Sequence, residues 1–225
     1  VLRKKEFKIY KTNILIMLKN NNISIIDYKV GNLLSIKRGL EICGARATVT
    51  NDSKKILSSS SVVLPGVGAF KRAMNLIKEY NLEDIIYRTI EKKIPLLGIC
   101  LGMQLLFEES NEFGEEKGLG IIKGTVKKLP EAKDKSLKIP SIGWNQLNIK
   151  KESTLFKNIK EKSSVYFVHS YMAVPEEKSI ITSSYNFGEQ DVTASINKEN
   201  IFGCQFHPEK SADNRLAILK NFCEI

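Results

Sequence analysis

Cys100 is the residue whose neighbours most clearly prepare it for chemistry. It lies within Pro95–Glu109, which reads PLLGICLGMQLLFEE. An apolar run of strand type, Leu96–Ile99, ends at the cysteine, and a helical pattern starts directly after it. Gly98 and Gly102 stand two residues away on either side. This spacing matches the Gly-x-nucleophile-x-Gly elbow, with sulfur in place of a hydroxyl.

The elbow explains both the glycines and the reactivity of the thiol. A sharp strand-to-helix reversal leaves no room for Cβ atoms beside the nucleophile, so glycine is needed there. The sulfur would lie at a helix N-terminus, where free backbone N–H groups and the positive end of the dipole favour a thiolate. The alternative is a buried core cysteine between glycines that permit tight packing.

A nucleophilic thiol needs a base, and the chain has only two histidines. His207 lies in GCQFHPEKS, where an apolar strand meets a proline. Residues two apart on extended chain point the same way, so Glu209 can lie behind His207 and orient its imidazole. This arrangement follows the nucleophile, base and orienter logic of a catalytic triad. His169, in YFVHSY, has no nearby carboxylate in the sequence and is expected to be structural.

The elements that must position these residues alternate along the first half of the chain. Short apolar strands are expected at 23–27, 47–50, 62–64 and 96–99, with helices at 32–43, 52–57, 71–79 and 82–92 between them. This order predicts an α/β fold with a mostly parallel central sheet flanked by helices. The later part is β-rich and ends in a helix at 214–222. The Gly66–Gly68 loop and the Cys100 elbow both follow strands, where functional loops of such sheets gather.

Composition narrows the class of protein. The 225 residues carry a net charge of +10, of which residues 1–16 contribute +4. The remaining basic residues are interspersed with acids, which favours a solvated basic surface over a nucleic-acid site. No apolar run approaches the length of a membrane span. The four cysteines show neither metal spacing nor a disulfide framework, so we expect a cytoplasmic protein without metal or cofactor.

Residues 1–16 are expected to be a disordered extension or a mis-called start, and 17–225 one domain.

Two of the motifs, GICLGMQ and QFHPEKS, resemble those of class I (triad) glutamine amidotransferases. The resemblance narrows to the glutaminase subunits of imidazole glycerol phosphate synthases. It covers residue 23 to the C-terminus through seven blocks in the same order: IIDYKVGNLLSI, LPGVGAF, PLLGICLGMQLLFE, KGLGIIKGTV, PSIGWN, YFVHSY and NIFGCQFHPEKS. It implies a flavodoxin-like fold and the release of ammonia from glutamine for histidine biosynthesis.

The resemblance also implies roles for individual residues. Cys100 would be the nucleophile, His207 the base and Glu209 its orienter. The other implied site residues would hold glutamine, or stabilise the oxyanion through backbone N–H groups: Gly66, Val67, Gly68, Leu101, Gln104, Glu112, Ser170 and Tyr171.

The implied partner is a (β/α)8-barrel cyclase subunit, which would form a heterodimer with this chain and receive the ammonia. The contact face would include Asn32, Trp144 and Asn145. Trp144 is the only tryptophan, and its glycine and asparagine neighbours favour an interface over a core position.

The sequence departs from the family pattern at three places expected near the partner. Lys29 stands where glycine is usual, Ser141 where histidine is common, and SADNRL lacks the usual glycine before its leucine. Two other functions therefore stay open. A related glutaminase could supply a surface-sugar amidotransferase, and a free-standing thiol γ-glutamyl hydrolase could use the same fold. A non-enzymatic relative is disfavoured because all three triad members are present.

Overall fold

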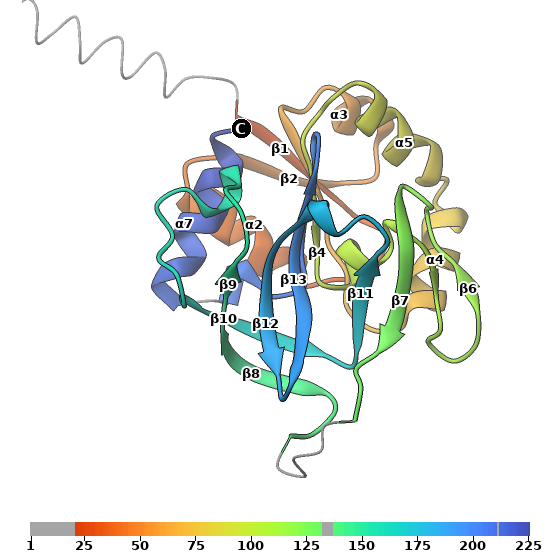
Figure 1. The fold of residues 1–225 in the computed structure, drawn as a ribbon. Helices are drawn as coiled ribbons and strands as arrows, with labels where there is room; N and C mark the ends of the chain where they lie inside the picture. The colour runs from red at the N-terminus through yellow and green to blue at the C-terminus, as the bar shows by residue number, and fades with distance from the viewer. Residues whose placement is uncertain (1–20, 132–136, 211) are drawn as a thin grey trace, which may run out of the picture.

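A computed structural model of the chain describes residues 21–131, 137–210 and 212–225. An eight-stranded sheet forms its centre, and helices cover both faces of this sheet (Figure 1). The α-helices are α2 (Leu33–Ile42), α3 (Ser53–Leu57), α4 (Phe70–Glu79), α5 (Glu83–Glu91), α6 (Leu101–Gln104) and α7 (Ala212–Cys223). Three short 3-10 turns are η1 (Thr154–Phe156), η2 (Lys178–Ile180) and η3 (Pro208–Lys210).

The central sheet has the order β2-β1-β3-β4-β14-β13-β12-β9. Its parallel half consists of β2 (Arg46–Thr50), β1 (Asn22–Ile26), β3 (Ser61–Leu64), β4 (Leu96–Ile99) and β14 (Ile201–Cys204). Antiparallel pairing adds β13 (Gln190–Lys198), β12 (Ile181–Phe187) and β9 (Asn148–Ile149). The expected α/β fold is confirmed, and the β-rich later part makes the sheet as a whole mixed.

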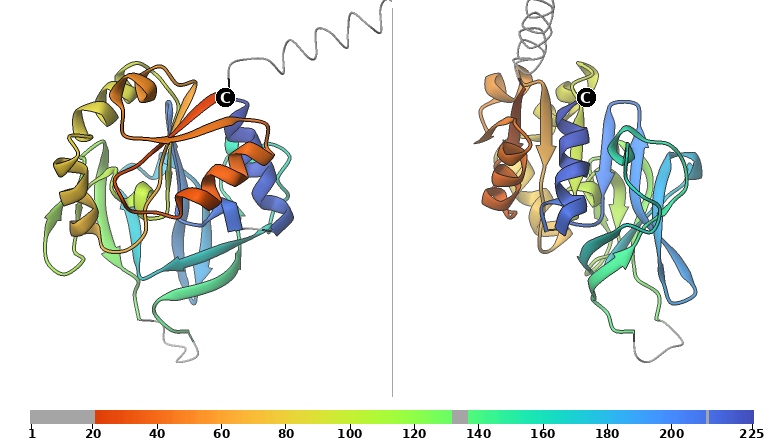
Figure 2. Two further views of the ribbon diagram at one scale, coloured as in Figure 1. Left: turned by 180° about the vertical axis from the view of Figure 1, so that it is seen from behind. Right: turned by 90° about the vertical axis from the view of Figure 1, so that its left-hand side faces the viewer.

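Alternating side chains of the parallel strands feed two cores. Ile25 and Leu97 face the side covered by α2 and α7, which lie next to each other (Figure 2). Ile26 and Leu96, one residue away in each strand, face the side covered by α4 and α5. These strands are buried on both faces, which is why they read as continuous apolar runs without polar alternation.

Two smaller sheets surround this centre. One pairs β8 (Ser141–Gln146) with β10 (Ser164–His169), and the other has the order β11-β7-β5-β6. The latter strands are β11 (Tyr171–Pro175), β7 (Ile122–Lys128), β5 (Phe107–Ser110) and β6 (Glu116–Lys117). β10 lies against the carboxyl ends of β4 and β14, since Val168 O approaches Cys100 Sγ at 4.0 Å and Tyr166 O accepts from His207 N–H at 2.9 Å.

Most expected elements are present within a residue or two of their expected bounds, and one differs. The helical pattern after Cys100 yields a single turn, α6, because Phe107–Ser110 leaves the helix and pairs with β7 as β5. The extension at 1–16 lies outside the described residues, so the domain bounds stay a prediction. Within the described ranges, no helix is long and apolar enough to cross a membrane.

Candidate active site

The elbow at Cys100 has the geometry that its glycines predict. Cys100 adopts φ +54° and ψ −114°, an unfavourable backbone conformation for a residue with a side chain. A Cβ on Gly102 would lie 1.9 Å from Leu64 O, and one on Gly98 would lie 2.8 Å from Met103 N. Both glycines are therefore required by close backbone approach, and the strained residue between them holds its thiol at the end of β4.

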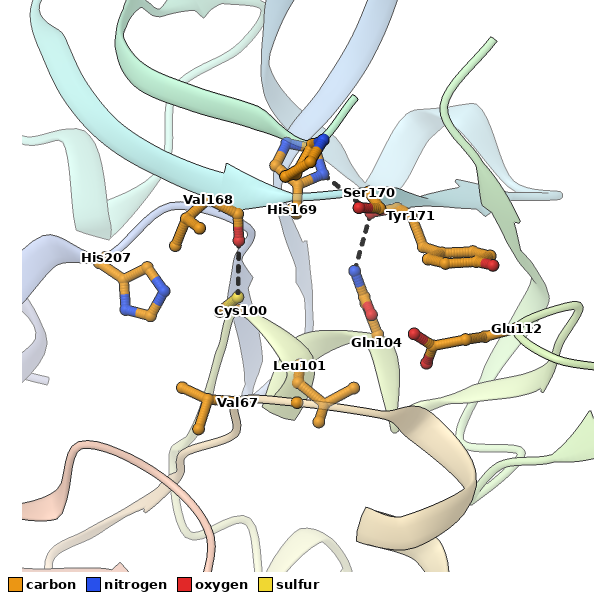
Figure 3. Close-up of a pocket in the computed structure, with 12 residues that line it drawn as sticks. Val67, Cys100, Leu101, Gln104, Glu112, Val168, His169, Ser170, Tyr171 and His207 are labelled. Atoms are coloured by element: carbon orange, nitrogen blue, oxygen red, sulfur yellow. Dashed lines mark hydrogen bonds between the residues drawn. The ribbon is translucent and has the colours of Figure 1, made fainter. Parts of the chain in front are cut away.

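His207 and Glu209 reach this thiol from the neighbouring strand. β14 pairs with β4 in parallel register, Cys204 opposite Ile99, so the chain after β14 passes beside the elbow. The His207 ring faces Cys100 (Figure 3), and its Nδ1 lies 2.8 Å from Glu209 Oε1. Both side chains are buried. Burial alone lowers the pKa of His207, but the hydrogen bonds and charges of Cys100 and Glu209 outweigh it and raise that pKa to about 10. The imidazole is therefore charged at neutral pH.

A cavity of about 260 Å³ opens beside the thiol. Its volume lies below the usual range for drug-sized ligands and suits a single amino acid. Its walls include ten residues predicted or discussed from the sequence, together with Pro140 and Val168: Val67, Gly68, Cys100, Leu101, Gln104, Glu112, His169, Ser170, Tyr171 and His207. Of the predicted catalytic and glutamine-binding residues, Gly66 and Glu209 do not line this cavity.

Two loops present backbone N–H groups at the thiol end of the cavity. Among the described residues, the N–H groups of Val67, Gly68 and Leu101 donate to no other protein group. Gly66 holds its loop against the elbow, because a Cβ there would lie 2.6 Å from Gly102 N. Beneath the loop, the buried hydroxyl of Tyr28 donates to Pro65 O at 2.6 Å. Unpaired N–H groups on a fixed backbone are suited to stabilise a developing oxyanion.

The opposite end of the cavity presents hydrogen-bond acceptors. Gln104 uses its amide Nε2 to donate to Tyr171 O (2.9 Å) and to Gln205 Oε1 (2.8 Å), which leaves its own oxygen free to accept. The Glu112 carboxylate accepts from Phe70 N–H at 2.6 Å and lies on the same side of the cavity as the Gln104 side chain (Figure 3). An amide oxygen and a carboxylate side by side suit an α-ammonium group.

His169 forms part of the wall of the cavity, and its role there is structural. Its Nδ1 lies 2.8 Å from Tyr171 O, which can only accept, so Nδ1 carries the proton. Nε2 therefore accepts from Tyr185 O–H at 2.7 Å. Burial lowers the pKa of His169 to about 4, so the ring is neutral at physiological pH. Only His207 is left to act as the base.

Two of the three residues expected at the partner face lie on strand β8 of the β8–β10 ribbon. Trp144 is half exposed and contacts Tyr166 edge to face, and Lys210 Nζ lies 5.7 Å from the Tyr166 ring centre. Asn145 is the next residue on the same strand, and Asn32 precedes α2. Both asparagines are partly exposed.

One departure begins this ribbon. Ser141 is the first residue of β8, is buried opposite His169 and hydrogen-bonds to Tyr185, so its own side chain is not on the surface. Its position near the partner stays a prediction. Lys29 is exposed and adopts φ +66°, a left-handed conformation that explains why glycine is usual there. Side chains 211–215 within SADNRL lie outside the description.

Several residues near the thiol were missed from the sequence. Gln205 is fully buried, and its Nε2 lies 3.6 Å from Cys100 Sγ. Tyr28, Pro140 and Val168 also support or line the cavity. Its place two residues before His207 in QFHPEKS was a hint, but the sequence does not show that it contacts Cys100. Across the described ranges, no cluster of three or more His, Cys, Asp or Glu residues could hold a metal ion.

Comparison with known proteins agrees with this geometry. The family model for class-I glutamine amidotransferases matches residues 24–225. The imidazole glycerol phosphate synthase subunit HisH of Aquifex aeolicus is 50% identical over 88% of this chain and 94% of its own length. The HisH subunit of Thermosynechococcus vestitus is 46% identical over 89% of this chain and 95% of its own length. The chain belongs to the HisH family of class-I glutamine amidotransferases.

Solved structures show that this HisH-family chain shares its fold with more distant class-I amidotransferases. A crystal structure titled as a glutamine amidotransferase matches with a TM-score of 0.69 at 16% identity, covering 90% of this chain and 99% of that one. The structure of PurLQS from Thermotoga maritima matches with a TM-score of 0.66 at 18% identity, covering 89% and 96%. At these identities the likeness concerns the fold alone.

Proposed function

We propose that this chain is the glutaminase subunit of an imidazole glycerol phosphate synthase, active in the cytoplasm. It would hydrolyse glutamine to glutamate and ammonia through Cys100, His207 and Glu209. The observation that carries this proposal is the elbow thiol facing a buried, carboxylate-oriented imidazole at the end of a cavity of amino-acid size. The identity to named HisH subunits supports the pathway.

The charge state of His207 defines the first step. With its pKa raised to about 10, the imidazole already carries the proton that it later donates. The thiolate attacks the side-chain carboxamide of glutamine, and the C–N bond breaks as His207 gives its proton to the departing ammonia. The neutral imidazole then takes a proton from water, which attacks the thioester and releases glutamate.

The cavity would bind glutamine in one orientation. The acceptors at Gln104 and Glu112 would hold the α-ammonium, with the backbone at Ser170 and Tyr171 beside them. The carboxamide then reaches Cys100, and its oxygen can accept from the N–H groups of Leu101 and the Gly66–Gly68 loop. Losing one such donor typically costs about 2.7–4 kcal/mol of barrier, so the position of this loop can set the rate.

The partner would be a cyclase subunit of (β/α)8-barrel form, in a heterodimer that transfers ammonia without releasing it to water. The HisH names of the relatives support a second subunit, since each names one subunit of a synthase. The ribbon that carries Trp144 and Asn145 also supplies Val168 to the cavity, so a partner docked there would lie close to the thiol.

The test is Cys100→Ser in the complete two-subunit enzyme. We expect glutamate release to fall by at least about a thousandfold, while synthesis from added ammonium salts continues. Cys43→Ser is the matched control, because its thiol lies outside the cavity, and it should leave both reactions unchanged. Glutamine turnover near the parent rate in Cys100→Ser would refute the proposal.

A further inference from the structure

A buried amide beside the thiol has no role in the mechanism above. Gln205 directly follows β14, and its side chain is fully buried. The parallel register places it beside the nucleophile, because Cys204 pairs with Ile99 and Cys100 N–H donates to Cys204 O at 2.7 Å. Gln205 N–H donates in turn to Ala194 O on β13 at 2.8 Å, which anchors the residue in the sheet.

A sequence of hydrogen bonds determines which end of this amide meets the sulfur. Tyr171 O is a carbonyl and can only accept, so Gln104 must turn its Nε2 toward it. The second hydrogen of that Nε2 then points to Gln205, which must present Oε1. Gln205 is left with its NH₂ group facing Cys100, where Nε2 lies 3.6 Å from Sγ. His169 also donates to Tyr171 O, which helps to fix the position of this carbonyl.

Besides His207, two polar groups lie near the sulfur, and they favour different protonation states of it. Val168 O accepts, and therefore serves only the protonated thiol, at a long distance of 4.0 Å (Figure 3). Gln205 Nε2 donates, and a carboxamide keeps its protons throughout the physiological range. A donor that cannot transfer its proton interacts more strongly with an anion than with the neutral group.

We propose that Gln205 is a thiolate-stabilising residue of the glutaminase: its amide N–H holds the Cys100 sulfur as an anion between the elbow and His207. The inference rests on the proposed function, because it assumes that Cys100 is the nucleophile. It assigns to Gln205 a function separate from that of His207, since Gln205 stabilises the anion and never takes up or gives a proton. Gln104 becomes a link between the substrate cavity and this donor.

The test measures how the reactivity of Cys100 depends on pH in the full chain. Iodoacetamide alkylates thiolates, and digestion with trypsin isolates Cys100 in the peptide 94–117, apart from the other cysteines. In Gln205→Met, which removes the donor at similar volume, we expect the midpoint of alkylation to rise by about one pH unit. At a pH well below both midpoints, this corresponds to about tenfold slower alkylation. In Gln205→Glu, which keeps an acceptor for Gln104 but adds an anion, the rise should be larger.

A control separates this effect from general damage to the fold. Phe206→Leu alters the next residue, which is equally buried and contacts Phe167 but has no polar group near the thiol. It should lower the melting temperature without moving the alkylation midpoint.

Glutamate release gives a second measurement of the role of Gln205. We expect kcat/KM of Gln205→Met to fall most at low pH and to recover toward the parent value as pH rises. A merely structural role would lower kcat/KM equally at every pH.

The outcomes distinguish the two levels of the proposal. Suppose that Cys100→Ser abolishes glutamate release but Gln205→Met leaves the alkylation midpoint unchanged. This result overturns the role of Gln205 alone. Persistent glutamate release in Cys100→Ser overturns the proposed function, and the role of Gln205 with it. If Gln205→Met fails to fold, Gln205→Glu supplies the same measurement, and a midpoint at the parent value there also overturns the inference.

Discussion

The two histidines of this chain have opposite charge states because their buried neighbours differ. His207 faces the Cys100 sulfur and a carboxylate, which both raise its pKa, whereas His169 lies between a carbonyl and a phenol. Burial then dominates at His169 and is outweighed at His207. One side chain can transfer protons, and the other maintains the shape of the cavity.

The neutral state of His169 predicts a pH dependence of stability. Its pKa is about 4 in the folded protein and about 6.5 in an unfolded chain, so the unfolded state binds the extra proton as the pH falls. Stability should therefore decline between about pH 6.5 and 4, by at most about 1.4 kcal/mol per pH unit from this residue.

His169→Gln tests this assignment by urea unfolding at pH 7.5, 6 and 5. The variant should be less stable than the parent at pH 7.5, because it loses hydrogen bonds to Tyr171 and Tyr185. Its further loss toward pH 5 should be smaller than that of the parent. Parallel stability curves for the two proteins would contradict a neutral buried His169.

For single residues, the sequence could identify the triad because the patterns that indicate it lie close together in the chain. Glycine spacing reports the elbow, and Glu209 follows His207 closely enough to orient it. Gln205 could not be recognised in the same way, because its contact with Cys100 depends on the register between β4 and β14. The burial of Ser141 was not predictable either, because it depends on the packing of Tyr185 against the ribbon.

Among the elements, the elbow is held by backbone contacts that no side-chain repacking can relieve. Gly102→Ala should cost at least about 3 kcal/mol of unfolding free energy, since its Cβ would lie 1.9 Å from Leu64 O. Gly120→Ala is the contrasting control: its φ of +62° is unfavourable for alanine, but nothing lies within 4 Å of the added Cβ.

Urea unfolding of both glycine variants gives the comparison. The control should lose about 1–2 kcal/mol, the usual cost of a left-handed alanine. Equal losses in the two proteins would contradict the close approach of β3 to α6 as the reason for glycine at position 102, since Gly102 has no positive φ.

Apolar periodicity was a reliable guide to the parallel half of the sheet and its helices. It was less reliable after Cys100, where Leu105 and Leu106 continue a helical pattern although the helix ends at Gln104. Both leucines are buried in the same core as residues of β5 and β7, and they would be apolar whether the helix continued or ended. Periodicity alone could not distinguish one helical turn from three.

In the whole molecule, we expect the partner to bind at the β8–β10 ribbon, which carries the exposed Trp144. Trp144→Ala should weaken binding of the histidine-pathway cyclase by about thirtyfold, the effect of removing a central aromatic side chain. It should change the stability of the isolated chain by less than about 1 kcal/mol, because half of the side chain is exposed. Ile42→Ala, at an exposed apolar residue near the far end of α2, is the control and should not alter binding.

Titration of the cyclase against each variant, followed by glutamate release, gives both the affinity and the stimulation. We expect the cyclase to raise the parent rate by orders of magnitude. Stimulation only by a barrel paralogue from the same source would transfer the glutaminase to a surface-sugar pathway. Full activity of the isolated chain would argue against control by a partner and favour a free-standing hydrolase.

The position of β14 has a consequence for how the enzyme is made. This strand lies in the interior of the central sheet, between β4 and β13, although it comes from the last twenty-five residues of the chain. A ribosome synthesises the thiol about one hundred residues before the base, so most of the domain exists before its catalytic machinery can form. Cys100 therefore stays an ordinary thiol during most of synthesis, and glutamine is consumed only by chains whose final strand has entered the sheet.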